Sequence, residues 1–371
     1  QGEGLRGRPI TRDLDWGIPV PREGWESKCL YVWFEAVIGY LSASIEWGQL
    51  FDHPDSWSKW WQTAESRSYY FIGKDNIPFH AIIWPGELIG VGTTFDELRN
   101  SPNPATLVLP YDVPANEFMN LEGQKISGSR NWAVWARDFL TRYDPDPLRY
   151  YLTVAMPESK DTDWDWEDFY KRNNDELVAT WGNLANRVLA FTYKHWDGQI
   201  PDPGELTDID RELIATVDEG FQTVGAELEA VHLRAALNEA MRLAGEVNRY
   251  LDITAPWQAI KTNRTEAARA VFTALRAINS LKILLSPFLP FTSEKLHRIM
   301  GYDQPLFGAQ KVQQVTDSLG EHTVLTYDAT PATGTWQPAE IQPGQVLHQP
   351  VPLFRKLEPK IIEEERARLG S

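Results

Sequence analysis

The stretch Phe71-Ile72-Gly73-Lys74-Asp75-Asn76-Ile77-Pro78-Phe79-His80 has the pattern of a strand that turns at a glycine and runs into a helix. It presents a carboxylate, an amide and an imidazole after the turn. Side chains in this position, past the carboxyl end of a strand, bind ligands in open parallel sheets. We therefore expect an α/β fold with a site at this turn. Taken alone, Asp75 also fits a helix N-cap, and His80 also fits a hydrogen-bonded core histidine.

A second apolar segment lies upstream, Tyr31-Val32-Trp33-Phe34-Glu35-Ala36-Val37-Ile38-Gly39-Tyr40. We expect a buried strand that runs into small residues, which would leave a concave space for a small apolar ligand beside the aromatic rings. A plain core strand entering a helix is the alternative. Apolar runs at Cys29–Phe34, Ser68–Ile72 and Thr106–Pro110 alternate with longer mixed stretches, which indicates strand–crossover–strand units.

The pattern changes to helical spacing after Glu167, most clearly between Leu228 and Leu251. We expect helices over residues 166–300, with one ending near Asp252 and another beginning at Pro256. Residues 301–350 are rich in Gly, Pro, Gln and Thr and predict an irregular extension. An apolar plug at 351–354 and a last helix over 358–369 should follow it.

Composition narrows the class of protein. The 371 residues carry 36 basic and 52 acidic side chains, a formal charge of −16, which disfavours indiscriminate binding to nucleic acid but does not exclude a local nucleic-acid-binding surface. The single cysteine, Cys29, excludes a disulfide framework and indicates a cytoplasmic setting. The sequence has no run of eighteen apolar residues and no charged-then-apolar leader, so we expect no membrane span and no secretory signal.

The hexapeptide Lys125-Ile126-Ser127-Gly128-Ser129-Arg130 has the composition of a mobile, phosphate-binding loop. It resembles the second signature loop of class I aminoacyl-tRNA synthetases, which usually contains Lys-Met-Ser-Lys-Ser. Gly128 stands where the second lysine is expected. Alone, the loop fits a solvated basic turn equally well.

Together with Thr11–Pro21, these segments resemble the methionyl-tRNA synthetase family, bacterial type, over nearly the whole chain. Valyl-, isoleucyl- and leucyl-tRNA synthetases share the loop but have different neighbours around the glycine and aspartate at the strand end. The resemblance implies ATP-dependent formation of methionyl-adenylate and transfer of methionine to its tRNA, with ATP and Mg²⁺ as the substrate complex. A class I synthetase for another apolar amino acid fits less well, because a small branched side chain would fill the aromatic space poorly.

The resemblance also implies roles for individual residues. Arg12 and Asp75 should lie between the amino acid and ATP, with Lys125 as the loop cation and Asn76 as a weaker nucleotide contact. The methionine pocket should be lined by Trp33, Ala36, Val37, Tyr40, Phe79, His80 and Trp84. A thioether gains roughly 0.3 to 1.5 kcal/mol against ring edges, and a proton donated by Tyr40 or His80 would favour sulfur over a methylene.

Two helical segments match the family's anticodon-reading helices, Trp181–Arg187 and Tyr250–Trp257. By this resemblance Asn183 and Arg187 should bond to anticodon base edges while Trp257 stacks on an unstacked base. A packed helix-start tryptophan and a salt-bridged surface arginine are the alternatives.

Two departures from the family pattern bear on activity. Gly128 leaves the loop with Lys125, and Arg130 is a possible substitute for the missing lysine. None of the seven histidines forms the His-x-Gly-His signature that binds ATP, and the zinc knuckle of the connective insertion has no counterpart in this sequence. We therefore interpret the chain as the carboxyl-terminal part of the enzyme, without its amino-terminal nucleotide-binding half and without a zinc site. Such a chain should be a poor catalyst alone, and the missing half is a possible partner.

The expected organisation has four parts. Residues 1–145 form the carboxyl-terminal half of a Rossmann-like catalytic domain, 146–168 a stem-contact segment, 169–300 an α-helical anticodon-binding domain, and 301–371 an irregular extension with a final helix. The rival function is a tRNA anticodon-binding module, or one half of a split synthetase. A pure binding module has no need of Trp33, Asp75, His80 and Lys125 together.

Two acidic stretches remain. Asp161–Asp168 resembles a calcium loop but lacks the turn glycine, and Asp165 three residues before Asp168 also fits a helix start. Glu363–Glu365 is expected to be a solvated helix face.

Overall fold

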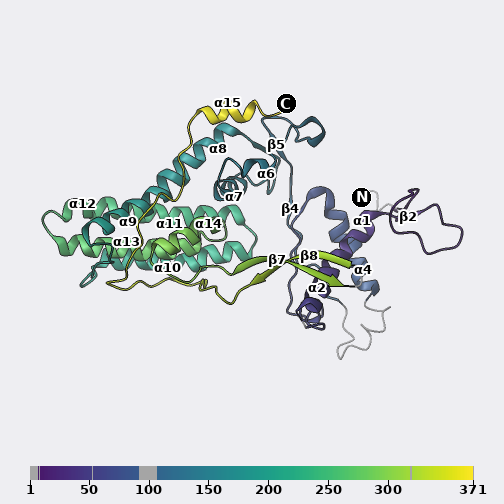
Figure 1. Ribbon diagram of the computed structural model, residues 1–371, viewed down its shortest axis with the longest axis horizontal. Coiled ribbons are helices and arrows are strands. Elements are labelled where there is room, and N and C mark those ends of the chain that lie inside the picture. The colour runs from purple at the N-terminus through teal and green to yellow at the C-terminus, as the bar shows by residue number, and fades with distance from the viewer. Residues whose placement is uncertain (1–6, 8, 52, 92–106, 318–319, 371) are drawn as a thin grey trace, which may run out of the picture. The chain divides into compact units, whose positions relative to one another are not determined.

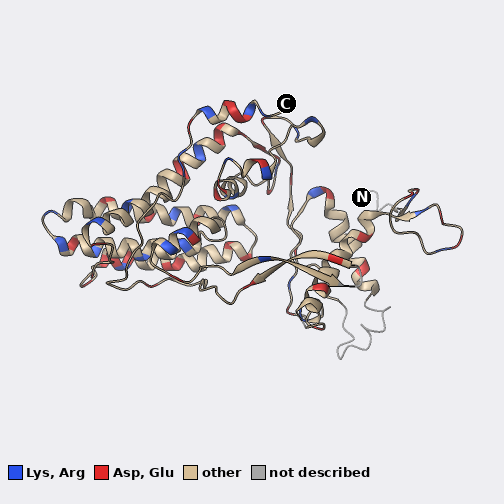
Figure 2. Cartoon of the chain, viewed as in Figure 1, with Lys and Arg blue, Asp and Glu red and all other residues tan. Residues whose placement is uncertain are grey.

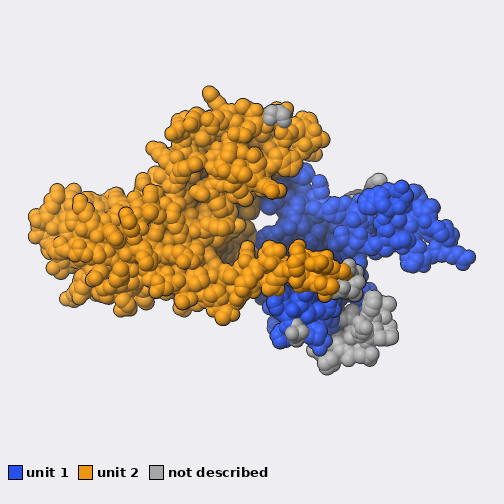
Figure 3. All heavy atoms as spheres, in the orientation of Figure 1, with its two compact units in different colours: residues 1–118, 157–161 blue, residues 119–156, 162–371 orange. Residues whose placement is uncertain are grey.

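The computed structural model describes residues 7, 9–51, 53–91, 107–317 and 320–370 (Figure 1). They form two compact units (Figure 3): unit 1 is Gln1–Phe118 with Pro157–Asp161, and unit 2 is Met119–Met156 with Thr162–Ser371. The expected domain boundary at 145 falls inside unit 2, so the Lys125 loop belongs to the same unit as the helical part. In the described part of the chain, no helix combines the length and the apolar character needed to cross a membrane.

Unit 1 is α/β, with very short strands. β1 (Thr11–Arg12) pairs antiparallel with β2 (Cys29–Leu30), and β3 (Ile72–Gly73) pairs parallel with β4 (Ala115–Asn116). Its helical elements are α1 (Val32–Glu35), η1 (Ala36–Ile38), α2 (Gly39–Leu50), α3 (Ser58–Trp61), η2 (Lys74–Asn76), η3 (Phe79–Ile83) and α4 (Trp84–Val91). The predicted order of strand, turn at Gly73 and helix is confirmed.

The expected strand over Tyr31–Tyr40 is wrong, because α1, η1 and the start of α2 occupy this segment. An apolar run does not by itself distinguish a buried strand from a helix. The three pocket candidates Trp33, Val37 and Tyr40 are spaced at i, i+4 and i+7, which places them on one helix face. The run at 106–110 also gives no strand at 107–110, and Thr106 lies outside the described residues.

Unit 2 begins with a small aromatic core. β5 (Met119–Leu121) pairs parallel with β6 (Thr162–Trp164). Around this pair lie α6 (Ala136–Phe139), α7 (Pro145–Val154), α8 (Trp166–Arg172) and α15 (Lys360–Arg366). The buried rings are Phe139, Tyr143, Tyr151, Trp164, Trp166 and Phe169.

The acidic stretch before α8 starts that helix. The side chain of Asp165 accepts a hydrogen bond of 2.8 Å from the backbone N–H of Asp168, as expected for an N-cap. The described residues contain no group of three or more His, Cys, Asp or Glu side chains able to hold a metal ion.

A helical bundle forms the rest of unit 2, as predicted for residues 166–300. It consists of η5 (Asn173–Gly182), α9 (Asn183–His195), α10 (Asp208–Glu229), α11 (Leu233–Thr254), α12 (Pro256–Ala259), α13 (Arg264–Leu284) and α14 (Pro290–Ile299). α11 ends at Thr254 and α12 begins at Pro256, within two residues of the expected break. α13 is the central helix, because nearly all of its residues after Glu266 are buried.

Residues 301–371 are more regular than expected. β7 (Ala309–Asp317) and β8 (Gly320–Asp328) form an antiparallel hairpin in which Val312 faces Leu325. Most residues of the two strands are polar, among them Gln310, Gln313, Gln314, Thr323 and Thr326, so no apolar period of two marks the strands in the sequence. The apolar plug is confirmed at Leu353 and Phe354, which are both buried.

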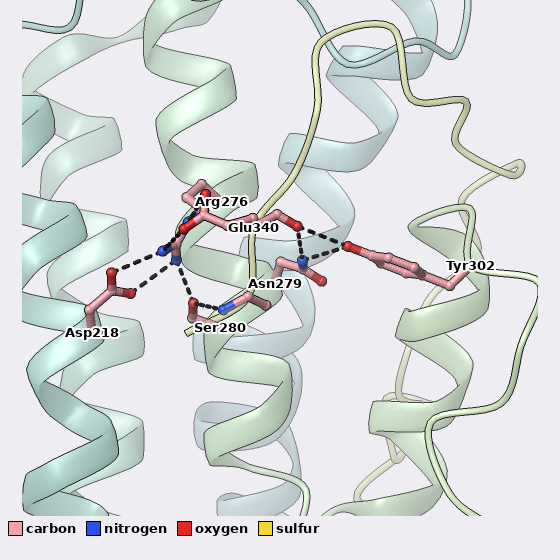
Figure 4. A network of polar contacts seen from close by, with 7 residues as sticks. Asp218, Arg276, Asn279, Ser280, Tyr302 and Glu340 are labelled. Atoms are coloured by element: carbon pink, nitrogen blue, oxygen red, sulfur yellow. Dashed lines mark hydrogen bonds and ion pairs between the residues drawn. The ribbon is translucent and has the colours of Figure 1, made fainter. Parts of the chain in front are cut away.

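A buried arginine ties the returning chain to the bundle (Figure 4). Arg276 on α13 is 4% exposed and donates to both carboxylate oxygens of Asp218 on α10, at 3.0 and 2.9 Å. It also donates to both oxygens of Glu340, at 3.2 and 2.8 Å, and to Ser280 Oγ at 2.6 Å. Asn279 donates to the hydroxyl of Tyr302 at 2.8 Å. One helix thus holds a neighbouring helix and the irregular segment in register.

Lys282 lies three residues after Asn279 and is almost fully buried, at 1% exposed. Its ammonium nitrogen is 2.7 Å from Asn279 Oδ1 and 2.9 Å from His297 Nδ1. Burial lowers the pKa of Lys282 from 10.5 to about 7. Burial and then the charge of Lys282 lower the pKa of His297 from 6.5 to about 4.

We expect the free energy of unfolding to fall as the pH is lowered from 10 to 7 and again from 6.5 to 4. In both windows the unfolded chain binds more protons than the folded chain, because both folded-state pKa values are depressed. Urea unfolding across this range tests the expectation. Lys282→Met should flatten the upper window, and an unchanged slope in that variant would contradict the assignment.

Candidate functional site

The residues predicted for a methionine pocket form an aromatic cluster in unit 1. Its buried floor consists of Val37, Phe79, His80 and Trp84, which are 2% to 7% exposed, whereas Trp33 and Tyr40 are 45% and 43% exposed. Ala36 is also exposed. The ring centroids of Trp33 and Phe79 are 5.7 Å apart. The cluster therefore has a packed base and two rings that a ligand can reach.

A hydrogen-bond chain fixes the polar groups of this cluster. His80 Nδ1 is 3.0 Å from the carbonyl oxygen of Asn76, and His80 Nε2 is 2.8 Å from the Tyr40 hydroxyl. A carbonyl only accepts, so we assign the proton of a neutral ring to Nδ1, and Nε2 accepts from Tyr40. The proton on His80 Nδ1 and the hydroxyl proton of Tyr40 are therefore both donated within the cluster. A thioether placed against this cluster would therefore meet ring surfaces and no free donated proton.

Tyr70 belongs to the cluster and was missed by the sequence analysis. Its hydroxyl accepts from Trp84 Nε1 at 2.9 Å, and its ring packs edge-on against Tyr40 with centroids 5.0 Å apart. Burial, followed by the proximity of Tyr70, raises the pKa of Tyr40 above its ordinary value. Tyr70 lies outside the two-residue strand β3, so no strand pattern in the sequence identified it.

Arg12 and Asp75 also lie in unit 1. Within the described residues the structure shows no contact between these two side chains. The Arg12 guanidinium lies over the Tyr31 ring, 4.0 Å from its centroid, and donates to the carbonyl oxygen of Thr11 at 3.2 Å. Asp75 is exposed inside η2, whose N-cap is Gly73, so the N-cap interpretation of Asp75 is wrong. Its carboxylate is open to a ligand at the end of β3.

The phosphate-loop candidate lies in unit 2. Residues Gly128–Arg130 form a single 3-10 turn, η4, and the backbones of Ser127 and Trp132 exchange hydrogen bonds of 2.9 Å on either side of it. Arg130 donates from Nη2 to the carbonyl oxygen of Lys125 at 3.1 Å, which places its exposed guanidinium beside the start of the loop. The loop is thus held at its base with both cationic side chains exposed.

The predicted anticodon residues are brought together at one end of the bundle. Asn183 and Arg187 are one helical turn apart on α9, and both are exposed. The Arg187 guanidinium lies over the ring of Trp257 on α12, 4.4 Å from its centroid. The salt-bridge alternative for Arg187 finds no support, because Arg187 has no ion pair within the described ranges.

The chain is similar to known families and proteins over nearly its whole length. A family model described as tRNA synthetases class I (M) matches residues 2–189, and one described as the anticodon binding domain of methionyl tRNA ligase matches residues 200–329. A "Methionine--tRNA ligase" of Thermomicrobium roseum is 53% identical over 99% of this chain, and one of Roseiflexus castenholzii is 51% identical over 99%. The chain spans 61% of the length of each of these relatives.

Solved structures agree on the fold. Mycobacterium tuberculosis methionyl-tRNA synthetase bound by methionyl-adenylate matches with a TM-score of 0.72 and 23% identity, over 95% of this chain and 61% of that one. The free enzyme from the same organism matches with a TM-score of 0.70 and 24% identity. The α/β class and the helical anticodon-binding part are therefore confirmed.

Proposed function

The chain belongs to the family of class I tRNA synthetases described as type M, the methionyl-tRNA synthetases, and from this premise we propose that it serves ATP-dependent ligation of methionine to its tRNA. The observation that carries the proposal is the 53% identity to a methionine–tRNA ligase over 99% of the chain. Because the chain spans 61% of that relative, we assign the complete reaction to the protein at the full length of its family. The remaining length, whether on the same chain or on a partner chain, would supply the rest of the ATP site.

The proposed chemistry consists mainly of positioning and electrostatics. The carboxylate of methionine attacks the α-phosphate of ATP, pyrophosphate leaves, and the adenylate then passes methionine to the 3′ end of the tRNA. Asp75 would orient the amino acid, Arg12 would offset the negative charge, and Lys125 would stabilise the leaving pyrophosphate together with Mg²⁺. Ser127, Gly128, Ser129 and the backbone at Ile126 would close the loop around the phosphates.

We place the methionine side chain against the aromatic cluster. The exposed faces of Trp33 and Tyr40 lie beside the buried Phe79 and Val37, which is the arrangement that an apolar, polarizable thioether requires. The hydrogen bond from Tyr40 to His80 keeps both polar groups paired before the ligand arrives.

The partner RNA would be a methionine tRNA, bound through the α9–α12 end of the bundle. We expect the 371-residue chain to bind an RNA hairpin with a CAU loop more tightly than the same hairpin with an altered loop. Trp257→Ala should weaken binding by about 1–3 kcal/mol, because one base loses its stacking partner. Fluorescence titration at a stated salt concentration measures both effects, and equal binding of the two hairpins would contradict the anticodon assignment.

The alternative is a tRNA-binding module without catalysis, or one half of a split synthetase. Titration of the chain with methionine distinguishes a tRNA-binding module from a synthetase. ATP–pyrophosphate exchange, measured with the rest of the family's length also present, then tests the complete activation step. Methionine binding that is lost in Tyr40→Ala favours the enzyme, since a pure RNA-binding module needs no such pocket. We further propose a cytoplasmic location, where the buried thiol of Cys29 stays reduced.

A further inference from the structure

A second arginine–tryptophan stack lies beside the predicted anticodon residues. Trp196 follows α9 directly, and the guanidinium of Arg264, at the start of α13, lies 5.2 Å from its ring centroid. Arg264 also donates to the carbonyl oxygen of His195. The first stack, Arg187 on Trp257, joins α9 to α12 in the same way. Both stacks therefore join α9 to the corner formed by α12 and α13.

The two stacks are close enough to contact one RNA strand. Arg187 and Trp196 are nine residues apart along α9, which corresponds to about 13 Å of helix axis. Trp257 and Arg264 bracket the short connection between α12 and α13. Phe191 and His195 pack against Trp196, with centroids 5.8 and 6.2 Å from it, and hold its ring in place.

The charge around the second stack favours an anion. Arg187, Lys194, Lys261 and Arg264 are all exposed, and none of them has a carboxylate partner in the parts of the chain that the structure describes. Elsewhere in the bundle, Arg211 on α10, Arg242 and Arg249 on α11, and Arg269 on α13 are paired with acidic groups. Figure 2 shows basic segments at the end of the bundle that carries α12. A chain of charge −16 thus keeps a small set of unneutralised cations at one place.

The pKa of a neighbouring imidazole, that of His195, is affected by these positive charges. Burial, and then the charges of Lys194 and Arg264, lower the pKa of His195. The lowered pKa favours the neutral ring, which packs against Trp196 and adds a flat surface beside it.

We propose that Trp196, Arg264 and Lys194 form a second RNA-binding subsite, which takes a nucleotide of the anticodon loop or stem outside the bases read by Asn183, Arg187 and Trp257. Trp196 stacks on the nucleotide, while Arg264 and Lys194 hold its phosphate. The inference rests on the proposed function, since it presumes that this end of the bundle meets RNA. Backbone contacts set affinity and register without reading sequence, so the subsite should act equally on every anticodon.

The test uses the 371-residue chain and two RNA hairpins, one with a CAU loop and one with an altered loop, titrated over a range of salt concentrations. Trp196→Ala should weaken binding of both hairpins by roughly tenfold, and Trp196→Phe should restore most of it. Arg264→Gln should weaken both and reduce the slope of log K against log salt by about 1. Lys295→Gln, an exposed lysine on α14, is the matched charge control and should change neither quantity.

The outcomes separate the two proposals. If Trp257→Ala weakens binding while Trp196→Ala and Arg264→Gln bind as the unmodified chain, the subsite is overturned and the anticodon assignment stands. If Trp196 and Arg264 matter but the loop sequence and Trp257 do not, the subsite is supported and the anticodon assignment fails. If none of the variants matters, both are overturned. The salt slope of Arg264→Gln, a surface change, distinguishes lost phosphate contact from any loss of folding caused by removing Trp196.

Discussion

Replacement of Lys125 with alanine is expected to lower the rate of methionine-dependent ATP–pyrophosphate exchange by about 10²- to 10³-fold, measured in the protein at the full length of its family. The reason is that a loop cation acts on charge that develops on the leaving pyrophosphate, so its removal affects the transition state more than the ground state. The KM for methionine should change little, because the proposed role of Lys125 is toward the phosphates of ATP and not toward the methionine side chain.

Two variants of the same loop make this test specific. Arg130→Ala lowers the rate if Arg130 substitutes for the missing lysine, and an unchanged rate shows that it only braces the carbonyl oxygen of Lys125. Gly128→Lys restores the usual loop sequence. A Cβ atom at Gly128 would lie 3.4 Å from the Trp135 ring, so the side chain fits with a small adjustment. A normal rate in Lys125→Ala would remove the loop from the proposed mechanism.

The helical half of the protein was predictable because its signals are local. The apolar residues of α11 recur at helical spacing, and Pro256 lacks the N–H that a continuing helix needs, so the break could be placed within two residues. The anticodon residues followed from a resemblance to a family whose models match residues 2–189 and 200–329, and the stack of Arg187 on Trp257 places two of them in contact. Their roles in binding remain predictions.

The misassigned segments depend on partners that are distant in sequence. The run Tyr31–Tyr40 is helical because its aromatic face packs on η3 and α4, about forty residues later, and not because of its intrinsic propensity. Tyr70 joins the aromatic cluster through a hydrogen bond from Trp84, fourteen residues later, which no local sequence pattern reveals. Polar residues outnumber apolar ones in the β7–β8 hairpin, so hydrophobic alternation did not identify it.

The three glutamates of α15 are the clearest case in which partners distant in sequence decide the burial of a residue. Glu363 and Glu364 are exposed as expected, whereas the prediction for Glu365 is wrong, since only 3% of it is exposed. Glu365 accepts from Arg142 Nε and Nη2 at 2.7 and 2.8 Å and from the Tyr143 hydroxyl at 2.9 Å. Its partners precede it by more than 220 residues, so a run of like charges conceals one buried, fully paired member.

Glu365→Ala is therefore expected to lower the free energy of unfolding of unit 2 by about 2 kcal/mol, because it removes the buried acceptor of Arg142 and of the Tyr143 hydroxyl, and only Arg142 keeps another partner, Asp138 at 2.7 Å. Glu364→Ala removes an exposed carboxylate one position away and should change stability by less than about 0.5 kcal/mol. Urea unfolding followed by tryptophan fluorescence measures the difference, since Trp166 lies 6.4 Å from the Tyr143 ring. If the two variants were equally stable, α15 would be held by its apolar face at Ile361 and not by this ion pair.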